Sequence, residues 1–253
     1  MSGGLLDGKV VVVTGASAGI GADAARVFAR EGARLILTAR RESELSALVA
    51  ELEAGGAEAG YVAGDIADAD TAKRLVDAAV DRFGGIDGAF NNAGISGSGA
   101  LIDVPEEEFD LLWNVNVKGT WYSLRAEIRA MLAAGRGGSI VNTSSVSGIK
   151  GSVGLGSYQA TKHAVIGLTR TASWDNAPKG IRVNALAPGA TETETFSAWR
   201  ERDPDAVGMR IARIPYGRPA TPSEVGEAAA WLLSDRSGTI TGVVLPIDGG
   251  VTA

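Results

Sequence analysis

Two residues in the second half of the chain, Tyr158 and Lys162, have the types and spacing needed for proton transfer. Because they are four residues apart, they would lie on one face of a helix. A tyrosine hydroxyl has an ordinary pKa of about 10, too high for a base at neutral pH, but a neighbouring ammonium lowers that pKa. The pair therefore suits acid–base chemistry, although taken alone it could equally be an exposed pair on a surface helix.

A glycine-rich segment, Thr14–Gly21, could bind phosphate groups. Its glycines, Gly15, Gly19 and Gly21, lie between a short apolar run and a helical pattern. Glycines let the backbone turn sharply and approach a pyrophosphate, while the start of the following helix offers free N–H groups. The segment predicts a dinucleotide site; the alternative is a tight turn that happens to contain three glycines.

The elements that would position these residues alternate along the chain. The β-branched run Lys9–Thr14 suits a strand buried on both faces, as parallel sheets provide. Further strands are predicted at 34–38, 59–63, 86–90, 138–143, 181–186 and 242–247, with helices at 22–30, 42–53, 69–83, 106–133, 157–176 and 223–234. This alternation predicts an α/β fold with a single domain over residues 1–253: a Rossmann-type, doubly wound, mostly parallel seven-stranded sheet flanked by helices.

Composition excludes several kinds of site. The chain has no cysteine and one histidine, which rules out disulfides and thiolate metal sites and leaves little for a histidine-based metal site. A net charge of −6 argues against broad binding to nucleic acid. No apolar run approaches the ~18–20 residues of a membrane span, and no signal peptide is evident. We therefore expect a cytoplasmic protein with no metal, nucleic-acid or membrane partner.

The glycine segment, read as T-G-x-x-x-G-x-G, resembles the cofactor-binding turn of the short-chain dehydrogenase/reductase family in its common form. The resemblance covers essentially the whole chain, because further motifs of that family follow in the same order. They are Asn91-Asn92-Ala93-Gly94, Asn116, Ser145, Tyr158-x-x-x-Lys162, Pro188-Gly189 and Asp248-Gly249-Gly250.

This resemblance implies an oxidoreductase that transfers a hydride between NADP(H) and a carbonyl or secondary alcohol, as a ketone reductase or alcohol dehydrogenase. Tyr158 would exchange a proton with the substrate oxygen, and Ser145 would hydrogen-bond the same oxygen. Lys162 would bind the nicotinamide ribose and tune Tyr158, while Asn116 would hold a water molecule in a proton relay.

Two neighbouring residues compete for these roles. Ser144 adjoins Ser145, and Asn114 lies two residues before Asn116. The spacing to Tyr158 and the Asn-Val-Lys-Gly context favour Ser145 and Asn116.

The end of the second strand favours NADP(H) over NAD(H). Ala39 stands where NAD-preferring relatives carry Asp, and Arg40 follows at once; a guanidinium can bind a 2′-phosphate bidentately. Arg40 and Arg41 could instead simply solvate the start of a helix. The segment Ser17–Ala18 lacks the second basic residue that NADP-preferring relatives often carry in the glycine turn.

The resemblance places other residues around the dinucleotide. Asp65 resembles the residue that hydrogen-bonds the adenine ring, and Thr193 belongs to the segment that meets the carboxamide. Thr191 departs from the family, which usually has Ile or Val there. The full set of expected cofactor-binding residues is Gly15, Ser17, Gly19, Ile20, Gly21, Arg40, Asp65, Ile66, Asn92, Ala93, Gly94, Tyr158, Lys162, Pro188, Gly189, Thr191 and Thr193.

The segment at about 190–217 has no clear period and is expected to be the substrate-binding loop. Phe196 and Trp199 are its candidate apolar walls, and Gly151–Gly156 would form the other side of the pocket. Glu192 and Glu194 would disfavour an anionic substrate if they point inward. We therefore expect a small neutral carbonyl or alcohol substrate.

Relatives in this family commonly form homotetramers, and the apolar strand near Val243–Ile247 is compatible with such an interface. Two alternatives stay open: an NAD-dependent secondary alcohol dehydrogenase of the same family, and a non-catalytic dinucleotide-binding protein. His163 follows Lys162 directly but would point about 100° away around the helix, which favours a packing or surface role.

Overall fold

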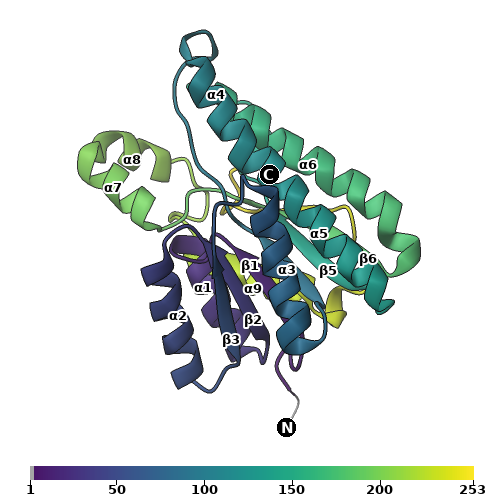
Figure 1. The fold of residues 1–253 in the computed structure, drawn as a ribbon. Coiled ribbons are helices and arrows are strands. Elements are labelled where there is room, and N and C mark those ends of the chain that lie inside the picture. The colour runs from purple at the N-terminus through teal and green to yellow at the C-terminus, as the bar shows by residue number, and fades with distance from the viewer. Residues whose placement is uncertain (1–2) are drawn as a thin grey trace.

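A parallel sheet of seven strands forms the centre of the computed structural model, which describes residues 3–253 (Figure 1). The strand order is β3-β2-β1-β4-β5-β6-β7, and every neighbouring pair runs parallel. The strands are β1 (Val10–Thr14), β2 (Arg34–Ala39), β3 (Ala59–Ala63), β4 (Gly88–Asn91), β5 (Gly138–Thr143), β6 (Ile181–Pro188) and β7 (Val244–Ile247). The predicted doubly wound α/β fold is confirmed.

Helices cover both faces of the sheet (Figure 1). On one face they are α1 (Gly19–Arg30), α2 (Glu42–Ala54) and α9 (Pro222–Leu233), and on the other α3 (Ala69–Phe83), α5 (Gly119–Ala134) and α6 (Gly156–Asn176). Side chains of β1 alternate between the two cores: Val11 and Val13 pack with α1, whereas Val10 and Val12 pack with α3. Burial on both faces explains why the strand is one unbroken apolar run.

The predicted helix over 106–133 is interrupted in the structure. It consists of α4 (Glu106–Trp113), a π-helical turn (Asn114–Lys118) and α5. A π turn inserts one extra residue into the helix, often at a functional site. Sequence periodicity did not show it, because the chain remains helical on both sides.

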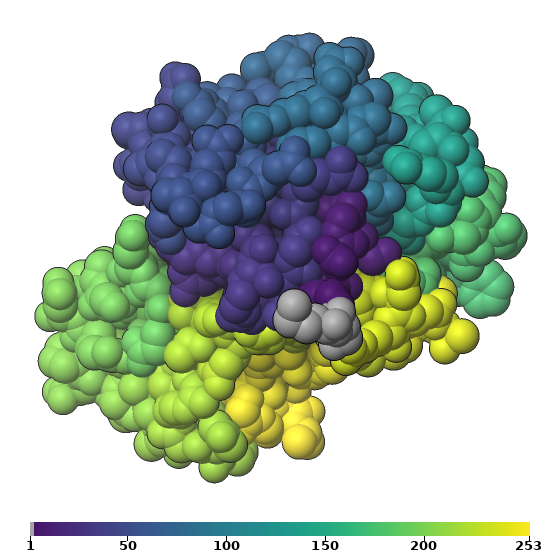
Figure 2. All heavy atoms as spheres, turned by 90° about the horizontal axis from the view of Figure 1, so that it is seen from below, coloured from purple at the N-terminus to yellow at the C-terminus, as the bar shows by residue number. Residues whose placement is uncertain are grey.

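The segment 190–217 also differs from the irregular loop that was expected. It contains two short helices, α7 (Glu194–Arg202) and α8 (Pro204–Ile211). Thr193 caps α7 by accepting a hydrogen bond from Phe196 N at 3.3 Å, and Asp203 caps α8 by accepting one from Ala206 N at 3.1 Å. In the space-filling view the light-green part of the chain that includes both helices forms a lobe beside the blue N-terminal half (Figure 2).

The sheet topology determines where a ligand can bind. The chain leaves β1 toward β2 on one side, and β4 pairs with β1 on the other. The connections therefore diverge at the carboxyl ends of β1 and β4, and open α/β sheets bind their ligands at such a crevice. In the part of the chain that the structure describes, no helix is both long and apolar enough to cross a membrane.

Candidate active site

Tyr158 and Lys162 lie on successive turns at the start of α6. The ammonium nitrogen of Lys162 is 5.7 Å from the centre of the Tyr158 ring and donates a hydrogen bond to Thr143 O at 2.9 Å. Burial lowers the pKa of Lys162 to about 8. Burial also raises the pKa of Tyr158, while a hydrogen bond with Ser145 and the charge of Arg210 oppose that rise.

Ser144 and Ser145, which follow β5, differ in their hydrogen bonds. The Ser144 hydroxyl donates to Lys162 O at 2.9 Å, so it is occupied in holding α6. The Ser145 hydroxyl accepts a hydrogen bond from Ser147 N at 3.1 Å and lies next to Tyr158. The Ser145 hydroxyl itself donates only a long hydrogen bond, to Pro188 O at 3.5 Å, so the geometry favours Ser145 as the serine beside Tyr158.

Asn116 lies in the π-helical turn and is almost fully buried, whereas Asn114 is half-buried. The side-chain amide of Asn116 binds the backbone of Ile95: Oδ1 accepts from Ile95 N at 2.8 Å, and Nδ2 donates to Ile95 O at 2.9 Å. A Cβ atom added to Gly94 would lie 3.2 Å from Asn116 Oδ1 and 3.3 Å from Lys162 Nζ. The polar ends of Asn116 and Lys162 therefore both lie beside Gly94, where only a residue without a side chain fits comfortably.

The glycine turn has the backbone geometry that a dinucleotide requires. Gly15 and Gly19 have positive φ angles of 71° and 54°, a conformation that favours glycine. A Cβ atom on Gly21 would lie 2.2 Å from Gly15 O, so only glycine fits there. The first turn of α1 has no side-chain cap and no acidic residue, which leaves its N–H groups free for an anion.

Thr14, the first residue of the glycine motif, joins the turn to β4 although it was not among the expected site residues. Its hydroxyl accepts hydrogen bonds from Asn92 N and Ala93 N, both at 3.0 Å. The Asn92 side chain in turn donates to Gly15 O at 3.4 Å. The structure thus brings Asn92, Ala93 and Gly94 against the turn, and the signal for Thr14 was present in the motif itself.

Two guanidinium groups follow β2. Arg40 is exposed. Arg41, interpreted from sequence only as a possible solvated residue, bends over the glycine turn and donates to Ser17 O at 3.1 Å and to Ser17 Oγ at 3.2 Å. Arg41 is also 3.4 Å from Glu44. Both positive charges therefore lie beside the neutral Ala39, where an adenosine ribose would be expected.

The other expected cofactor residues fall into two groups. The exposed carboxylate of Asp65 accepts from Ala67 N at 3.0 Å, while the side chain of Ile66 is buried against Gly119. Only the backbone of Ile66 is thus available to a ligand.

Pro188 is the last residue of β6 and Gly189 follows it; Gly189 N donates to Ile247 O at 3.0 Å. Thr191 pairs with Ala220 in a short bridge, and the Thr193 methyl lies 3.3 Å from the position of a Cβ on Gly19. The second group therefore connects β6 to the glycine turn.

Helix α7 carries an aromatic pair, and an ion pair joins it to Glu192, which precedes it. The ring of buried Phe196 meets Trp199 edge-on at 5.9 Å. Glu192 accepts from Arg200 at 2.5 Å, so its charge is neutralised, and Glu194 is exposed. Glu192 is thus paired, while Glu194 is accessible to solvent.

Three other sequence expectations have plain outcomes. On the opposite side Val153 is fully exposed and Leu155 is half-buried. His163 is also exposed, its ring nitrogen 2.9 Å from Gln159 O. Within residues 3–253 no group of three His, Cys, Asp or Glu side chains could hold a metal ion.

Comparisons with known proteins agree with this geometry. Residues 15–252 match a family model described as enoyl-(acyl carrier protein) reductase. The chain is 46% identical over 253 residues to an A-factor type gamma-butyrolactone 1′-reductase (1S-forming) of Streptomyces virginiae, covering 98% of this chain and 97% of the relative. It is 41% identical over 249 residues to a 2,5-dichloro-2,5-cyclohexadiene-1,4-diol dehydrogenase of Sphingobium indicum, covering 98% of both. A solved actinorhodin polyketide ketoreductase with NADPH matches with a TM-score of 0.91 and 34% identity, covering 99% of both chains.

Replacing Gly21 with Ala should abolish tight dinucleotide binding. The added methyl would overlap Gly15 O, so the backbone of the turn would have to move away from the conformation that suits a pyrophosphate. We expect the dissociation constant for NADPH, measured by fluorescence titration, to rise at least about tenfold. Gly167→Ala is the matched control, because a Cβ on this exposed α6 residue meets no other atom within 4 Å. Equal affinity of the two variants would contradict the assignment of the turn.

Proposed function

Because the chain belongs to the short-chain dehydrogenase/reductase family, we propose that this oxidoreductase transfers a hydride between NADP(H) and a small neutral ketone or secondary alcohol. Action on carbonyl and carbinol groups is common to the relatives. The observation that supports the proposal most is the meeting of Ser145, Tyr158 and Lys162 at the crevice of the sheet. A bound nicotinamide would supply or accept the hydride.

In the reducing direction Tyr158 donates its hydroxyl proton to the substrate oxygen. Ser145 donates a hydrogen bond to that oxygen and holds it beside Tyr158. Lys162, fixed by Thr143 O, stabilises the phenolate that remains through its positive charge. Asn116 lies beside Gly94, as Lys162 does, and holds the water through which the proton is replaced.

The preference for NADP(H) is supported by charge. Arg40 and Arg41 place two guanidinium groups at the end of β2, and Ala39 offers no carboxylate to a 2′-hydroxyl. The remaining cofactor contacts are proposed as expected from sequence, with Thr14 and Arg41 added. One related structure, the actinorhodin ketoreductase, was solved with NADPH.

A neutral substrate is supported by the apolar wall of Phe196 and Trp199 and by the pairing of Glu192 with Arg200. The names of two relatives, a butyrolactone reductase and a chlorinated diol dehydrogenase, support a small molecule with a carbonyl or carbinol group as substrate. The lid of α7 and α8 is the proposed substrate-binding segment.

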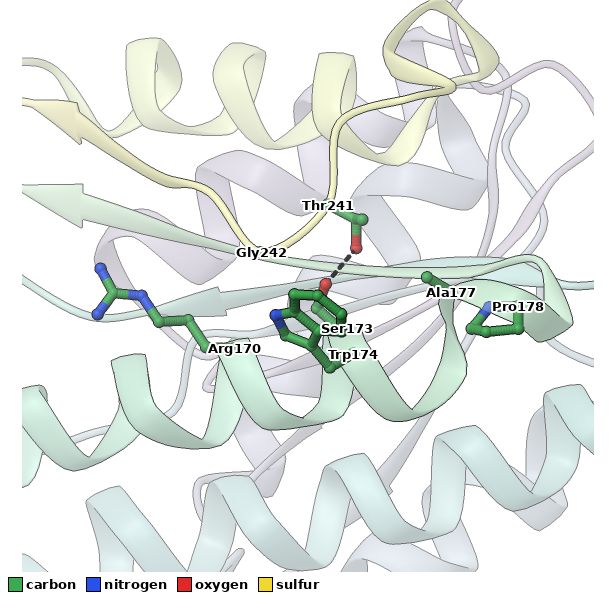
Figure 3. Close-up of a pocket in the computed structure, with 7 residues that line it drawn as sticks. All are labelled: Arg170, Ser173, Trp174, Ala177, Pro178, Thr241 and Gly242. Carbon is green, nitrogen blue, oxygen red and sulfur yellow. Dashed lines mark hydrogen bonds between the residues drawn. The ribbon is translucent and has the colours of Figure 1, made fainter.

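A homotetramer in the cytoplasm completes the proposal. Trp174 on α6 is 85% exposed, and large exposed aromatic side chains are typical of protein interfaces. It borders a groove of about 540 Å³, far along α6 from Tyr158, lined by Arg170, Pro178 and Thr241 among others (Figure 3). Val243, next to the edge strand β7, is also exposed.

Replacing Tyr158 with Phe should lower kcat about a hundredfold or more, because the proton donor is lost. NADPH binding should persist, which a fluorescence titration would show. The control Tyr61→Phe removes a hydroxyl that only contacts Glu42 on α2 and should leave kcat unchanged. Normal turnover by Tyr158→Phe would refute the role proposed for Tyr158. No turnover by the wild type on any ketone would favour the non-catalytic alternative.

Cofactor choice can be measured from kcat/KM with NADPH and NADH on one ketone. The wild type should prefer NADPH, and Arg40→Ala combined with Arg41→Ala should lose at least about tenfold of that preference, since charge-assisted hydrogen bonds to a phosphate are lost. Arg30→Ala, which breaks only surface pairs with Glu31 and Glu227, is the control. A wild-type preference for NADH would contradict the NADP(H) assignment and favour the NAD-dependent alternative.

Replacing Arg210 with Gln removes a charge that lowers the pKa of Tyr158, so that pKa should rise. In alcohol oxidation Tyr158 acts in its deprotonated form, so the acidic limb of the rate–pH profile should move to higher pH. Arg213→Gln on the same lid is the control. An unchanged rate–pH profile in Arg210→Gln would show that the charge of Arg210 does not affect the pKa of Tyr158 during the reaction.

Replacing Trp174 with Glu should dissociate the proposed tetramer, because the large apolar contact is lost and a carboxylate must give up its hydration to be buried there. The mass in solution, measured by light scattering after size-exclusion chromatography, reports the outcome. Val80→Glu on α3 should leave the mass unchanged. A monomeric wild type would refute the oligomeric part of the proposal.

A further inference from the structure

Glu127 on α5 is completely buried, yet none of the proposed catalytic steps uses it. An ionised carboxylate in a protein interior is costly unless a cation pairs with it. Only burial and a hydrogen bond from Asn91 act on the pKa of Glu127, so no described Lys, Arg or His compensates its charge. Such a group requires an explanation.

The carboxyl of Glu127 ends a chain of buried hydrogen bonds that crosses four elements. Asn91 Nδ2, on the last residue of β4, donates to Glu127 Oε2 and to Asn142 Oδ1, both at 3.0 Å. Asn142 Nδ2, on β5, donates to Thr169 Oγ1 on α6 at 2.9 Å. Asn91 and Asn142 are also direct partners in the sheet. We call these four residues the polar brace: Glu127, Asn91, Asn142 and Thr169.

Each element of the polar brace leads into a part of the active site. α5 continues the π-helical turn that contains Asn116, and β4 ends directly before the segment 92–94. β5 ends two residues before Ser145, and α6 carries the Tyr158–Lys162 pair. A shift of one element relative to another would therefore change distances among the proposed catalytic side chains.

The surroundings of Glu127 suit a neutral carboxyl. Its second oxygen, Oε1, has no hydrogen-bond partner, and neither does Asn91 Oδ1 nor the buried hydroxyl of Ser123, one turn earlier on α5. Asn91 Oδ1 can only accept, and a protonated carboxyl supplies the donor that a carboxylate lacks. Burial raises the pKa of Glu127 to about 8, which keeps the group protonated at neutral pH.

We propose that Glu127 is a positioning residue of this oxidoreductase, whose neutral carboxyl anchors the Asn91–Asn142 carboxamide pair and so fixes α5, β4, β5 and α6 relative to one another. The expected effect on kcat rests on the proposed function. The expected protonation of Glu127 and its effect on stability do not.

Protonation gives the brace a pH dependence. The recorded hydrogen-bond partner of Glu127 is Asn91, and the polar brace continues from Asn91 to Asn142 and Thr169. None of these titrates. Because the folded-state pKa is raised from 4.5 to about 8, the folded protein holds a proton that the unfolded chain releases, and the free energy of unfolding falls as pH rises through this window. A glutamine in place of Glu127 cannot ionise and would remove that fall.

The test compares Glu127→Gln and Glu127→Leu with the wild type. Met131→Leu is the control, since Met131 is buried one turn later on the same helix and has no hydrogen-bonding role. The wild type should show the infrared carbonyl band of a protonated carboxyl at neutral pH, and Glu127→Gln should lack it. The stability gained by Glu127→Gln should grow as pH rises toward about 8.

Kinetics separate positioning from packing. Glu127→Gln keeps an acceptor for Asn91 and should retain kcat, whereas Glu127→Leu should lower kcat about tenfold or more with little change in the KM for cofactor. Met131→Leu should retain kcat. Absence of the infrared band in the wild type, or wild-type kcat in Glu127→Leu, would overturn the proposal. If Glu127→Leu fails to fold, or if the protein reduces no ketone, the infrared band and the pH-dependent stability of Glu127→Gln still test the proposal. Absence of the band, or a stability difference that does not change with pH, would then overturn it.

Discussion

Parallel pairing of β1 with both β2 and β4 is the constraint on which the site depends. Because all seven strands run in one direction, their carboxyl ends meet at one edge, and the glycine turn, Asn92–Gly94, Ser145 and Pro188–Gly189 all follow strands at that edge. Thr14 then ties the first two of these segments together through two backbone hydrogen bonds. Residues far apart in the chain thereby form one crevice.

Burial determines the electrostatics of that crevice. It shifts the pKa of Lys162 down to about 8 and the pKa of Tyr158 up, so both groups are less charged than they would be in water. Ser145 and Arg210 act against the shift at Tyr158. Behind the crevice, burial also raises the pKa of Glu127, which favours a neutral carboxyl in a core that offers it no cation.

Much of this was predictable from sequence, because short motifs encode strand ends and turns. The ordered set from Thr14 to Gly189 predicted the family and the fold, and both are confirmed. The π-helical turn at Asn116, the helices of the lid and the path of Arg41 to Ser17 were not predicted. These features depend on hydrogen bonds between distant segments or on short capped helices, neither of which leaves a periodic pattern. Glu127 is an example, since only its contacts distinguish it from an exposed helical glutamate.

The central claim is direct hydride transfer at the crevice beside Tyr158. The most direct measurement uses NADPH deuterated at the transferring position of the nicotinamide, with a simple ketone as substrate and mass spectrometry of the alcohol product. The account predicts one deuterium at the new carbinol carbon and none when the label is on the opposite face of the ring. An alcohol product that carries no deuterium with either labelled cofactor would contradict it.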